Sequence, residues 1–282
     1  MNRLWLILDC NFLCHRARYS MGNLSFGGSA TGVAYGFLGE VLALREQFSP
    51  FSMVFCWDSR YSKRQEVFPD YKGKRKNRQP MAEEEMEFEW AFRKQVKLLR
   101  KKYLPTIGFK NVFQQKGYES DDLLASVAYS LSSKDQAVIV TADHDLFQCI
   151  RPNVSMYSPR DHKQHTLQTF KKELGITPAD WVYVKAIAGC DTDNVPGVKG
   201  VGEKTAILYL LKKIKVTAKT YKDIEHNGDL IARNTALVKL PYKGTKTFKL
   251  REDKLSQPGW EDVCDSLGFK SIRDKSLLGK RR

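Results

Sequence analysis

The sequence lacks any long apolar run. Its N-terminal run, from Leu4 to Leu8, ends at Asp9. Five residues are too few for the core of a signal peptide and far too few to span a bilayer. We therefore expect no association with a membrane and a location in the cytoplasm.

Cysteines with paired spacing are also absent. The sequence has six cysteines without a C-x-x-C pair, and several lie in apolar surroundings, which is typical of reduced, buried thiols. His162 and His165 have the spacing of half a zinc site, but no second pair of ligands accompanies them. The sequence therefore indicates neither a disulfide framework nor a structural zinc site.

Acidic residues are in the minority. The chain has 47 Lys and Arg against 32 Asp and Glu, a formal net charge of +15. Such a balance favours a polyanionic partner, and nucleic acid is the partner that we expect. With 282 residues and 42% hydrophobic content, the chain is long enough for one large domain with a smaller appended region.

The acidic minority is concentrated in five short clusters along the chain. Their members are Asp9, Asp58, Glu119, Asp121, Asp122, Asp143, Asp145 and Asp193. Any one of them alone is readily explained as a helix cap or a solvated turn. Together they predict a site for hard divalent cations, because carboxylates favour Mg²⁺ or Mn²⁺ over softer ions. Ions of this kind catalyse the cleavage of phosphodiesters.

Three short apolar runs end in aspartate: LWLILD (4–9), SMVFCWD (52–58) and QAVIVTAD (136–143). This pattern is typical of buried parallel strands. Helical patterns lie between them, at 31–48, at about 82–103, and at 121–131 after Ser120 as a predicted N-cap. The sequence therefore predicts an α/β fold with a mainly parallel central sheet flanked by helices. In such sheets ligands bind beyond the carboxyl ends of the strands, where the aspartates should lie.

A basic segment follows Asp58. Residues 59–78 contain eight Lys or Arg against Glu66 and Asp70. The stretch FPDYKGKRKNRQP within it is polar, aromatic and bounded by proline, which favours a mobile surface element over a packed one.

A glycine-rich turn, GVKGVGEKTA (197–206), precedes a helical pattern. Backbone amides in such a turn can face phosphate oxygens, so Gly197, Gly200 and Gly202, with Lys204 and Lys212 after them, are candidate contacts to a nucleic-acid backbone. The alternative is an ordinary connection between two helices. The spacing differs from that of a nucleotide-binding P-loop, so we infer no ATP site. From about residue 216 the sequence is basic and weakly patterned.

Five motifs in order carry a resemblance to a known family. They are LILDCNFLCHRA, FCWDSRYSKRQEVFPDYKGKR, GYESDD, TADHDLFQ and TDNVPGVKGVGEKTA. Over roughly residues 4–210 the chain resembles the 5′-nuclease family, the 5′→3′ exonucleases and flap endonucleases of bacteria and phages, including the nuclease domain of bacterial DNA polymerase I. The resemblance implies a PIN-like nuclease domain over 1–180 with a helical arch at 59–103, and a helix-hairpin-helix and C-terminal DNA-binding region over 181–282.

The resemblance also implies roles for individual residues. One metal ion would be held by Asp9, Asp58, Glu119 and Asp121, and a second by Asp143, Asp145 and Asp193, with Asp122 near both. Two ions about 3.5 to 4 Å apart can activate a water and stabilise a leaving oxygen. Candidate contacts to substrate are Lys63, Arg64, Tyr71, Lys72 and Arg75. Lys72 and Asp122 are the candidate catalytic groups, and K⁺ is a candidate ligand of the hairpin.

One motif departs from the family. Its members usually read G-D-x-x-D-N, whereas here Cys190 replaces the first aspartate and Asp191 follows one place later. Asp191 is therefore included among the candidate metal ligands. If the stretch is helical, one position rotates a side chain by about 100°, so we expect Asp191 not to occupy the place of the missing aspartate.

The expected function is metal-dependent hydrolysis of DNA at 5′ ends or flaps, in replication and repair, by a monomer of bacterial or phage origin. An RNA-primed duplex is a further candidate substrate. Two alternatives are a DNA-junction binding protein with reduced catalysis and a PIN-like ribonuclease. The dense carboxylates argue against pure binding, because they would repel phosphate. The basic segment and the hairpin motif favour duplex DNA over RNA alone.

Overall fold

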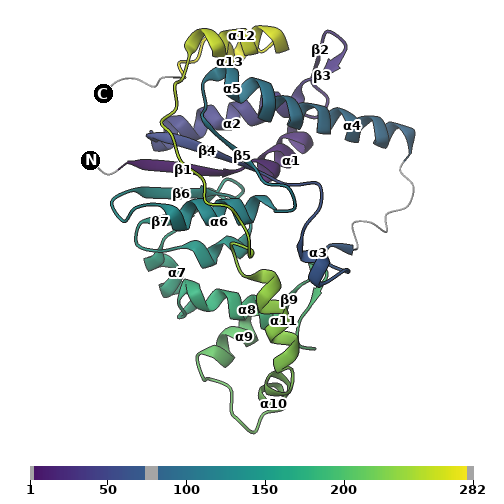
Figure 1. Ribbon diagram of the computed structural model, residues 1–282, viewed down its shortest axis with the longest axis vertical. Helices are drawn as coiled ribbons and strands as arrows, with labels where there is room; N and C mark the ends of the chain where they lie inside the picture. Colours follow the sequence, from purple (N-terminus) through teal and green to yellow (C-terminus); the bar gives the residue numbers. More distant parts are fainter. Residues whose placement is uncertain (1–2, 74–81, 278–282) are drawn as a thin grey trace.

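A six-stranded sheet forms the centre of the molecule in a computed structural model, which describes residues 3–73 and 82–277 (Figure 1). The strand order is β5-β4-β1-β6-β7-β8. The strands are β1 (Leu4–Asp9), β4 (Ser52–Trp57), β5 (Asn111–Gln114), β6 (Gln136–Val140), β7 (Val154–Ser158) and β8 (Lys163–His165). All neighbours pair in parallel except β7 and β8. From β1 the chain adds β4 and β5 on one side and then β6, β7 and β8 on the other. The topological switch point therefore lies between β1 and β6, and open α/β sheets bind ligands at such a point.

Helices cover both faces of the sheet. Those above it in Figure 1 are α1 (Cys10–Met21), α2 (Gly32–Phe48), α4 (Glu83–Leu98), α5 (Leu104–Ile107), α12 (Gln257–Leu267) and α13 (Lys270–Arg273). Those below it are α6 (Ser120–Ser130) and α7 (Leu167–Leu174). The tapering lower end consists of α8 (Trp181–Ala188), α9 (Glu203–Leu210), α10 (Lys219–His226) and α11 (Gly228–Val238). The remaining short helix, α3 (Arg64–Val67), lies beside the two-stranded sheet of β9 (Gly189–Cys190) and β10 (Val195–Pro196).

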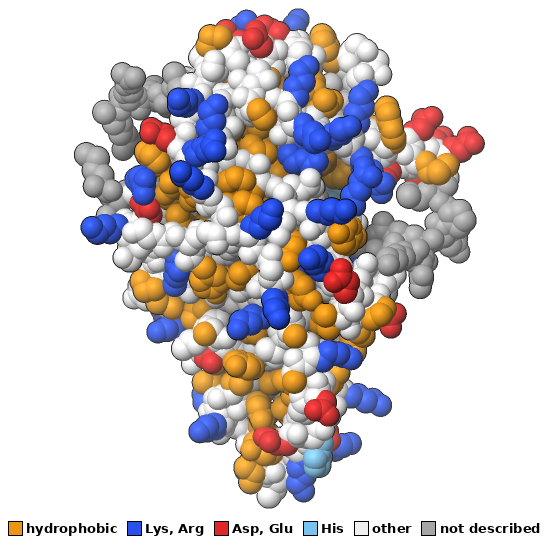
Figure 2. All heavy atoms as spheres, viewed as in Figure 1, with side chains coloured by type: hydrophobic (Ala, Val, Ile, Leu, Met, Phe, Trp, Pro, Cys, Tyr) orange, Lys and Arg blue, Asp and Glu red, His pale blue; other side chains and the backbone are white. Residues whose placement is uncertain are grey.

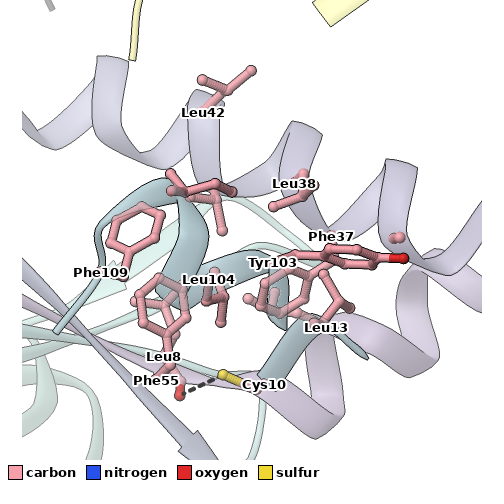
Figure 3. Packing of buried hydrophobic residues seen from close by; sticks show 14 of the residues in the cluster. Leu8, Cys10, Leu13, Phe37, Leu38, Leu42, Phe55, Tyr103, Leu104 and Phe109 are labelled. Atoms are coloured by element: carbon pink, nitrogen blue, oxygen red, sulfur yellow. Dashed lines mark hydrogen bonds between the residues drawn. The ribbon is translucent and has the colours of Figure 1, made fainter. Parts of the chain in front are cut away.

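The central strands bury both of their faces. In β1, Leu6 and Leu8 face one hydrophobic cluster while Trp5 and Ile7 face the other. Figure 3 shows the first cluster, in which Leu8 packs among aromatic residues from the helices above the sheet and from β4. Because side chains alternate along a strand, a continuous apolar run is what a strand buried on both faces needs. This explains why the apolar runs predicted the strands.

The predicted elements are confirmed with small changes at their ends. The three aspartate-terminated runs form β1, β4 and β6, and the helix predicted at 31–48 is α2. The helix predicted at about 82–103 is α4 continued by a π-helical turn, η2 (Leu99–Tyr103). In its apolar stripe Phe92, Leu99 and Tyr103 enter the core, whereas Phe88 is exposed.

The C-terminal residues return to the first half of the chain. An extended segment brings Asp253 beside β4, where its carboxylate accepts hydrogen bonds from Met53 N (2.8 Å) and Lys110 N (2.9 Å). Helix α12 then packs against α5, and Trp260 is fully buried in the same cluster as Leu8. The core on the other side of the sheet continues from Trp5 to Trp181 in α8. Packing is thus continuous across residue 180, where the sequence predicts a division into two regions, and that division stays a prediction.

Among the described residues, the structure has no helix with the length and apolar character needed to cross a membrane.

Replacing Trp260 by alanine tests the place of α12 in the core. The indole is fully buried and its Nε1 donates hydrogen bonds to the carbonyls of Ile272 and Arg273. We expect Trp260→Ala to lower the free energy of unfolding by about 3 to 5 kcal/mol in urea titrations. The matched control is Trp90→Ala, whose side chain is 65% exposed and for which we expect a change within about 1 kcal/mol. Equal effects of the two substitutions would contradict this packing.

Candidate metal centre

Three of the predicted carboxylates come together because their strands are neighbours. Asp9 ends β1, Asp58 directly follows β4, and Asp143 lies three residues after β6. Since β4 and β6 pair in parallel with the two sides of β1, their carboxyl ends lie at the same edge of the sheet. Among these three residues Asp9 is buried, Asp58 is half-buried and Asp143 is exposed.

Asp9 is held rigidly at the centre of this edge. Its carboxylate accepts hydrogen bonds from Phe12 N (3.1 Å), Thr141 Oγ1 (3.0 Å) and Ser120 Oγ (3.3 Å). Burial, together with the neighbouring Asp58 carboxylate, raises the pKa of Asp9 to about 7. These donors fix the orientation of the side chain, but within residues 3–73 and 82–277 no cationic side chain forms an ion pair with it, so the site favours either a proton or a bound cation.

The start of α6 supplies the next group of carboxylates. Glu119 rather than Ser120 is the N-cap, and Asp122 completes a reciprocal capping box with it. Ser120 instead donates its backbone N–H to Asp58 Oδ1 (2.6 Å). Asp121 Oδ1 is buried and accepts no hydrogen bond from the residues that the structure describes. Burial, followed by repulsion from Asp143, raises the pKa of Asp121 well above its ordinary value.

Asp122 points away from this group and into a buried ion pair. Its carboxylate is fully buried and receives two hydrogen bonds of 2.8 Å from the Arg64 guanidinium, which is 2% exposed. Arg64 also donates to Leu237 O (2.7 Å) and lies over the Tyr242 ring. The structure thus places both side chains in a buried ion pair, and the roles of Arg64 as a DNA contact and of Asp122 as a catalytic group stay predictions.

Tyr71 is buried in this structure, and its contact with a base stays a prediction. Its hydroxyl donates to Glu119 Oε2 (3.0 Å) and Asp193 Oδ2 (3.1 Å). Burial and these two carboxylates raise the pKa of Tyr71, so the phenol stays protonated as a donor. Within the stretch FPDYKGKRKNRQP, Tyr71 is thus packed while Pro69 and Asp70 are exposed, and residues 74–80 lie outside the described residues.

Lys72 brings a cation into the carboxylate cluster. Its Nζ lies 2.8 Å from Glu119 Oε2 and 3.6 Å from Asp193 Oδ1. Burial alone would raise the pKa of Glu119, but Lys72 and Arg64 hold it below its ordinary value. Lys72 adopts a left-handed backbone conformation (φ 56°), and its N–H donates to Asp193 O (2.8 Å). Such a conformation is uncommon outside glycine and recurs at functional sites.

Asp145 and Asp193 form the far side of the cluster together with Cys190. Their ligand atoms all lie within 4.8 Å of one another. Asp191 is exposed and lies outside this group. The stretch is not an α-helix, as the rotation argument assumed, because Cys190 ends β9 and a 3₁₀ turn, η5 (Asp191–Asp193), follows. The expectation that Asp191 does not replace the missing aspartate is nevertheless consistent with its exposure.

The cluster has the chemistry that a divalent cation requires. Besides Asp9 and Asp121, burial raises the pKa of Asp58 and of Asp145. Carboxylates in such mutual repulsion gain most from a shared cation. Asp121 Oδ1, which accepts no hydrogen bond from the described part of the chain, can serve as a ligand atom. The residues present therefore fit metal ions with oxygen ligands.

The glycine-rich turn divides into packed and exposed parts. Gly197 is packed so closely against Ala188 that a side chain would not fit, and its contact with phosphate stays a prediction. Gly200 and Gly202 are exposed, and Gly202 is the N-cap of α9. Lys204 and Lys212 are exposed as well. These four residues remain candidates for contact with a nucleic-acid backbone.

Lys63 and Arg75 are the two remaining residues that the resemblance implies as substrate contacts. Lys63 is half-buried with its Nζ over the Tyr118 ring. Arg75 lies outside the described residues.

Lys185 is a residue of the site that the sequence predictions missed. It lies in α8, and its Nζ is 3.0 Å from Asp145 Oδ1 and 3.1 Å from Glu203 Oε1. Burial alone would lower the pKa of Lys185, but Asp145 raises it above its ordinary value and keeps the ammonium charged. The signal was present, because Lys185 is the one charged residue in the apolar run WVYVKAIA. A buried cation in such a run needs an anionic partner.

Removing the Arg64 guanidinium tests whether that residue is structural. We expect Arg64→Met to lower the free energy of unfolding by about 3 to 5 kcal/mol, because it leaves Asp122 charged and buried without a partner. Urea titration provides the measurement, and the exposed Arg60→Met is the matched control. If Arg64→Met instead weakens DNA binding at unchanged stability, the guanidinium faces the substrate and the assignment is wrong.

The raised pKa of Asp9 predicts how stability depends on pH. Between its unfolded value near 3.8 and its folded value of about 7, the folded protein holds a proton that the unfolded chain releases. The free energy of unfolding of metal-free protein should therefore fall as pH rises through this window. Mg²⁺ binds the ionised carboxylates, so it should stabilise the folded protein more at pH 8 than at pH 6. Each kcal/mol of added stability should raise the melting temperature by about 2 to 4 °C. Melting curves with MgCl₂ and with EDTA measure this, and equal gains at both pH values would count against the site.

Sequence comparison identifies relatives across most of the chain. The family described as 5′-3′ exonuclease, N-terminal resolvase-like domain, matches residues 4–175. The 5′-3′ exonuclease of Bacillus subtilis is 32% identical over 215 residues, which cover 73% of this chain and 69% of that protein. DNA polymerase I of Mycobacterium leprae is 31% identical over 293 residues, which cover 96% of this chain but 31% of the polymerase. The chain thus spans about a third of that polymerase.

Solved structures share the fold. The T5 D15 protein co-crystallised with metal ions has a TM-score of 0.73 at 22% identity, covering 85% of this chain and 90% of that one. Flap endonuclease-1 from Methanococcus jannaschii has a TM-score of 0.60 at 16% identity, covering 96% and 90%. T5 D15 flap endonuclease has also been solved with DNA and metal ions, with a TM-score of 0.71 at 22% identity, covering 85% and 90%. The predicted mainly parallel α/β nuclease fold is confirmed, and the chain belongs to the 5′-3′ exonuclease family.

Proposed function

We propose that this protein is a structure-selective 5′ nuclease that hydrolyses phosphodiesters of DNA at 5′ ends or flaps during replication and repair. One observation carries the proposal: carboxylates from distant segments meet at the carboxyl edge of the sheet, and Asp121 Oδ1 is left there without a hydrogen-bond donor among the described residues. A surface that only bound DNA would gain nothing from this arrangement, because uncompensated carboxylates repel phosphate.

Mg²⁺ or Mn²⁺ is the metal that we propose for the centre, because most of the donors are carboxylate oxygens. Asp9, Asp58, Glu119 and Asp121 would hold one ion, and Asp143, Asp145 and Asp193 would hold a second. Bound there, divalent ions supply Lewis-acid chemistry that activates water and stabilises charge on phosphate oxygens.

The protein's own side chains prepare the site for this chemistry. Thr141 and Ser120 orient Asp9, and Tyr71 holds Glu119 and Asp193 at a fixed separation. The Lys72 ammonium lies at the same carboxylates and is 19% exposed, so it can approach a phosphate that enters the site. A preformed cation in this position stabilises the charge that develops on the scissile phosphate. Hydrolysis would leave a 5′-phosphate on the product.

The exposed basic residues provide the surface for DNA. Figure 2 shows Lys and Arg side chains spread over one face, from the helices above the sheet to the lower helices, with few acidic side chains among them. We propose that Lys63, Gly200, Gly202, Lys204 and Lys212 contact the phosphate backbone of the duplex. K⁺ at the turn before α9, action as a monomer and a location in the cytoplasm with the DNA belong to the same proposal.

Substituting Asp121 tests the centre directly. We expect Asp121→Asn to reduce cleavage of a labelled 5′-flap DNA in Mg²⁺ by at least about a hundredfold, or 2.7 kcal/mol of barrier. DNA affinity should stay the same or improve, because the substitution removes a charge that repels phosphate. The matched control is Asp262→Asn on the exposed side of α12.

The same assay separates the alternative functions. The protein is incubated separately with 5′-flap DNA, with an RNA-primed duplex and with single-stranded RNA, each in Mg²⁺ and in EDTA. Binding of flap DNA without Mg²⁺-dependent cleavage would indicate a junction-binding protein. Cleavage of RNA alone would indicate a ribonuclease.

Salt dependence tests the proposed duplex contacts. Each phosphate contact releases condensed counterions, so Lys204→Ala or Lys212→Ala should reduce the slope of log affinity against log salt by about 0.9. Lys134→Ala is the control, because Lys134 is exposed just before β6, at the opposite edge of the sheet. An unchanged slope in both variants would remove this turn from the DNA interface.

A further inference from the structure

A thiol lies among the carboxylates on one side of the metal centre. Cys190 Sγ and carboxylate oxygens of Asp145 and Asp193 lie within 4.8 Å of one another. The three residues come from three different elements: the 3₁₀ helix η3 (His144–Cys149), β9 and η5. Three donors at this spacing surround a single point, as the ligands of one ion do.

The backbone fixes Cys190 in this position. Gly189 before it has φ 78°, a left-handed conformation that favours glycine, and packs against the backbone of Gly197. Cys190 then pairs with Val195 across the β9–β10 ladder. Thr192 Oγ1 lies 3.1 Å from the sulfur and adds a polar neighbour. The thiol is therefore held at the site by main-chain geometry, together with packing against the small cluster of Tyr71, Val195 and Leu237.

Cys190 differs from every other cysteine in the chain. Cys10, Cys14, Cys56, Cys149 and Cys264 are buried, whereas Cys190 is partly accessible. It lines a hollow of about 10 Å³ with Asp145, Asp193 and Asp121, which is close to the volume that one water or one small ion needs. Asp121, whose Oδ1 accepts no hydrogen bond from the described residues, is one of the residues that line this hollow. This second observation points to a ligand in the hollow.

We propose that Cys190 is a metal ligand and that the site of Asp145, Cys190 and Asp193 binds a thiophilic divalent cation of the zinc class in preference to Mg²⁺. Thiolate is a soft ligand that suits Zn²⁺ and Co²⁺, whereas Mg²⁺ prefers oxygen. Binding forms a metal–sulfur bond and releases the thiol proton to solvent. The inference rests on the proposed function and refines it, because it replaces Mg²⁺ or Mn²⁺ by a zinc-class cation at the second ion site and leaves the first site unchanged.

Cobalt reports sulfur ligation without any assay of activity. We expect EDTA-stripped protein to develop a thiolate-to-Co²⁺ charge-transfer band in the near ultraviolet when it is titrated with Co²⁺. Cys190→Ser should lose the band, and Cys264→Ala, which removes a buried thiol in α12, should keep it. Competition with Zn²⁺ should give an affinity at least about tenfold weaker in Cys190→Ser. Cys190→Asp should lose the band and bind Mg²⁺ more tightly than the parent does.

A second measurement uses the unaltered protein. Iodoacetamide should modify Cys190 before the buried cysteines, as followed by peptide mass spectrometry. Zn²⁺ should slow this modification, and the same concentration of Mg²⁺ should not. Absence of the charge-transfer band in the parent, its persistence in Cys190→Ser, or equal alkylation rates with and without Zn²⁺ would each overturn the proposal. Failure of the nuclease proposal is distinct, because it appears as absence of Mg²⁺-dependent flap cleavage whatever the cobalt spectrum shows.

Discussion

The buried ion pair between Arg64 and Asp122 connects the parts of the site that lie far apart in sequence. Asp122 caps the start of α6 and also accepts the backbone N–H of Tyr242 (2.8 Å), while Arg64 reaches the carbonyl at Leu237. This one ion pair thus joins three segments. They are α3 in the basic segment, the helix α6 that carries Asp121, and the chain from the end of α11 to Tyr242. Since two buried charges must satisfy each other, these segments cannot separate without a large energetic penalty.

That framework makes a second arrangement of charges possible. Asp9 is buried and Asp58, Asp121 and Asp145 are half-buried, and this burial raises the pKa of each carboxyl group. Lys72 forms an ion pair with Glu119, and Lys185 forms one with Asp145. The two lysines thus offset part of the negative charge of the cluster. The remaining negative charge is what gives the site affinity for cations. Rigidity of the surrounding fold is therefore used to hold a locally unfavourable charge distribution.

Local patterns in the sequence predicted the strands and most of the carboxylates, because an apolar run ending in aspartate records both burial and position at the sheet edge. The partners of Arg64 and Tyr71 could not be predicted in this way. Arg64 pairs with a residue 58 positions away and Tyr71 with one 48 positions away, and composition alone makes both look like exposed members of a basic segment. The place of Cys190 likewise depends on the turn that Gly189 permits, which spacing alone does not reveal.

The return of the chain to the first core has a consequence for the order of synthesis. Trp260 and its neighbours in α12 belong to the same cluster as Leu6 and Leu8. The core around β1 is therefore incomplete until residues about 250 positions further along the chain have been synthesised. Contacts of such long range form slowly, and a growing chain on the ribosome exposes the apolar face of its first helices until α12 has emerged. A degradative activity built on this sheet would then be assembled only after α12 has been made.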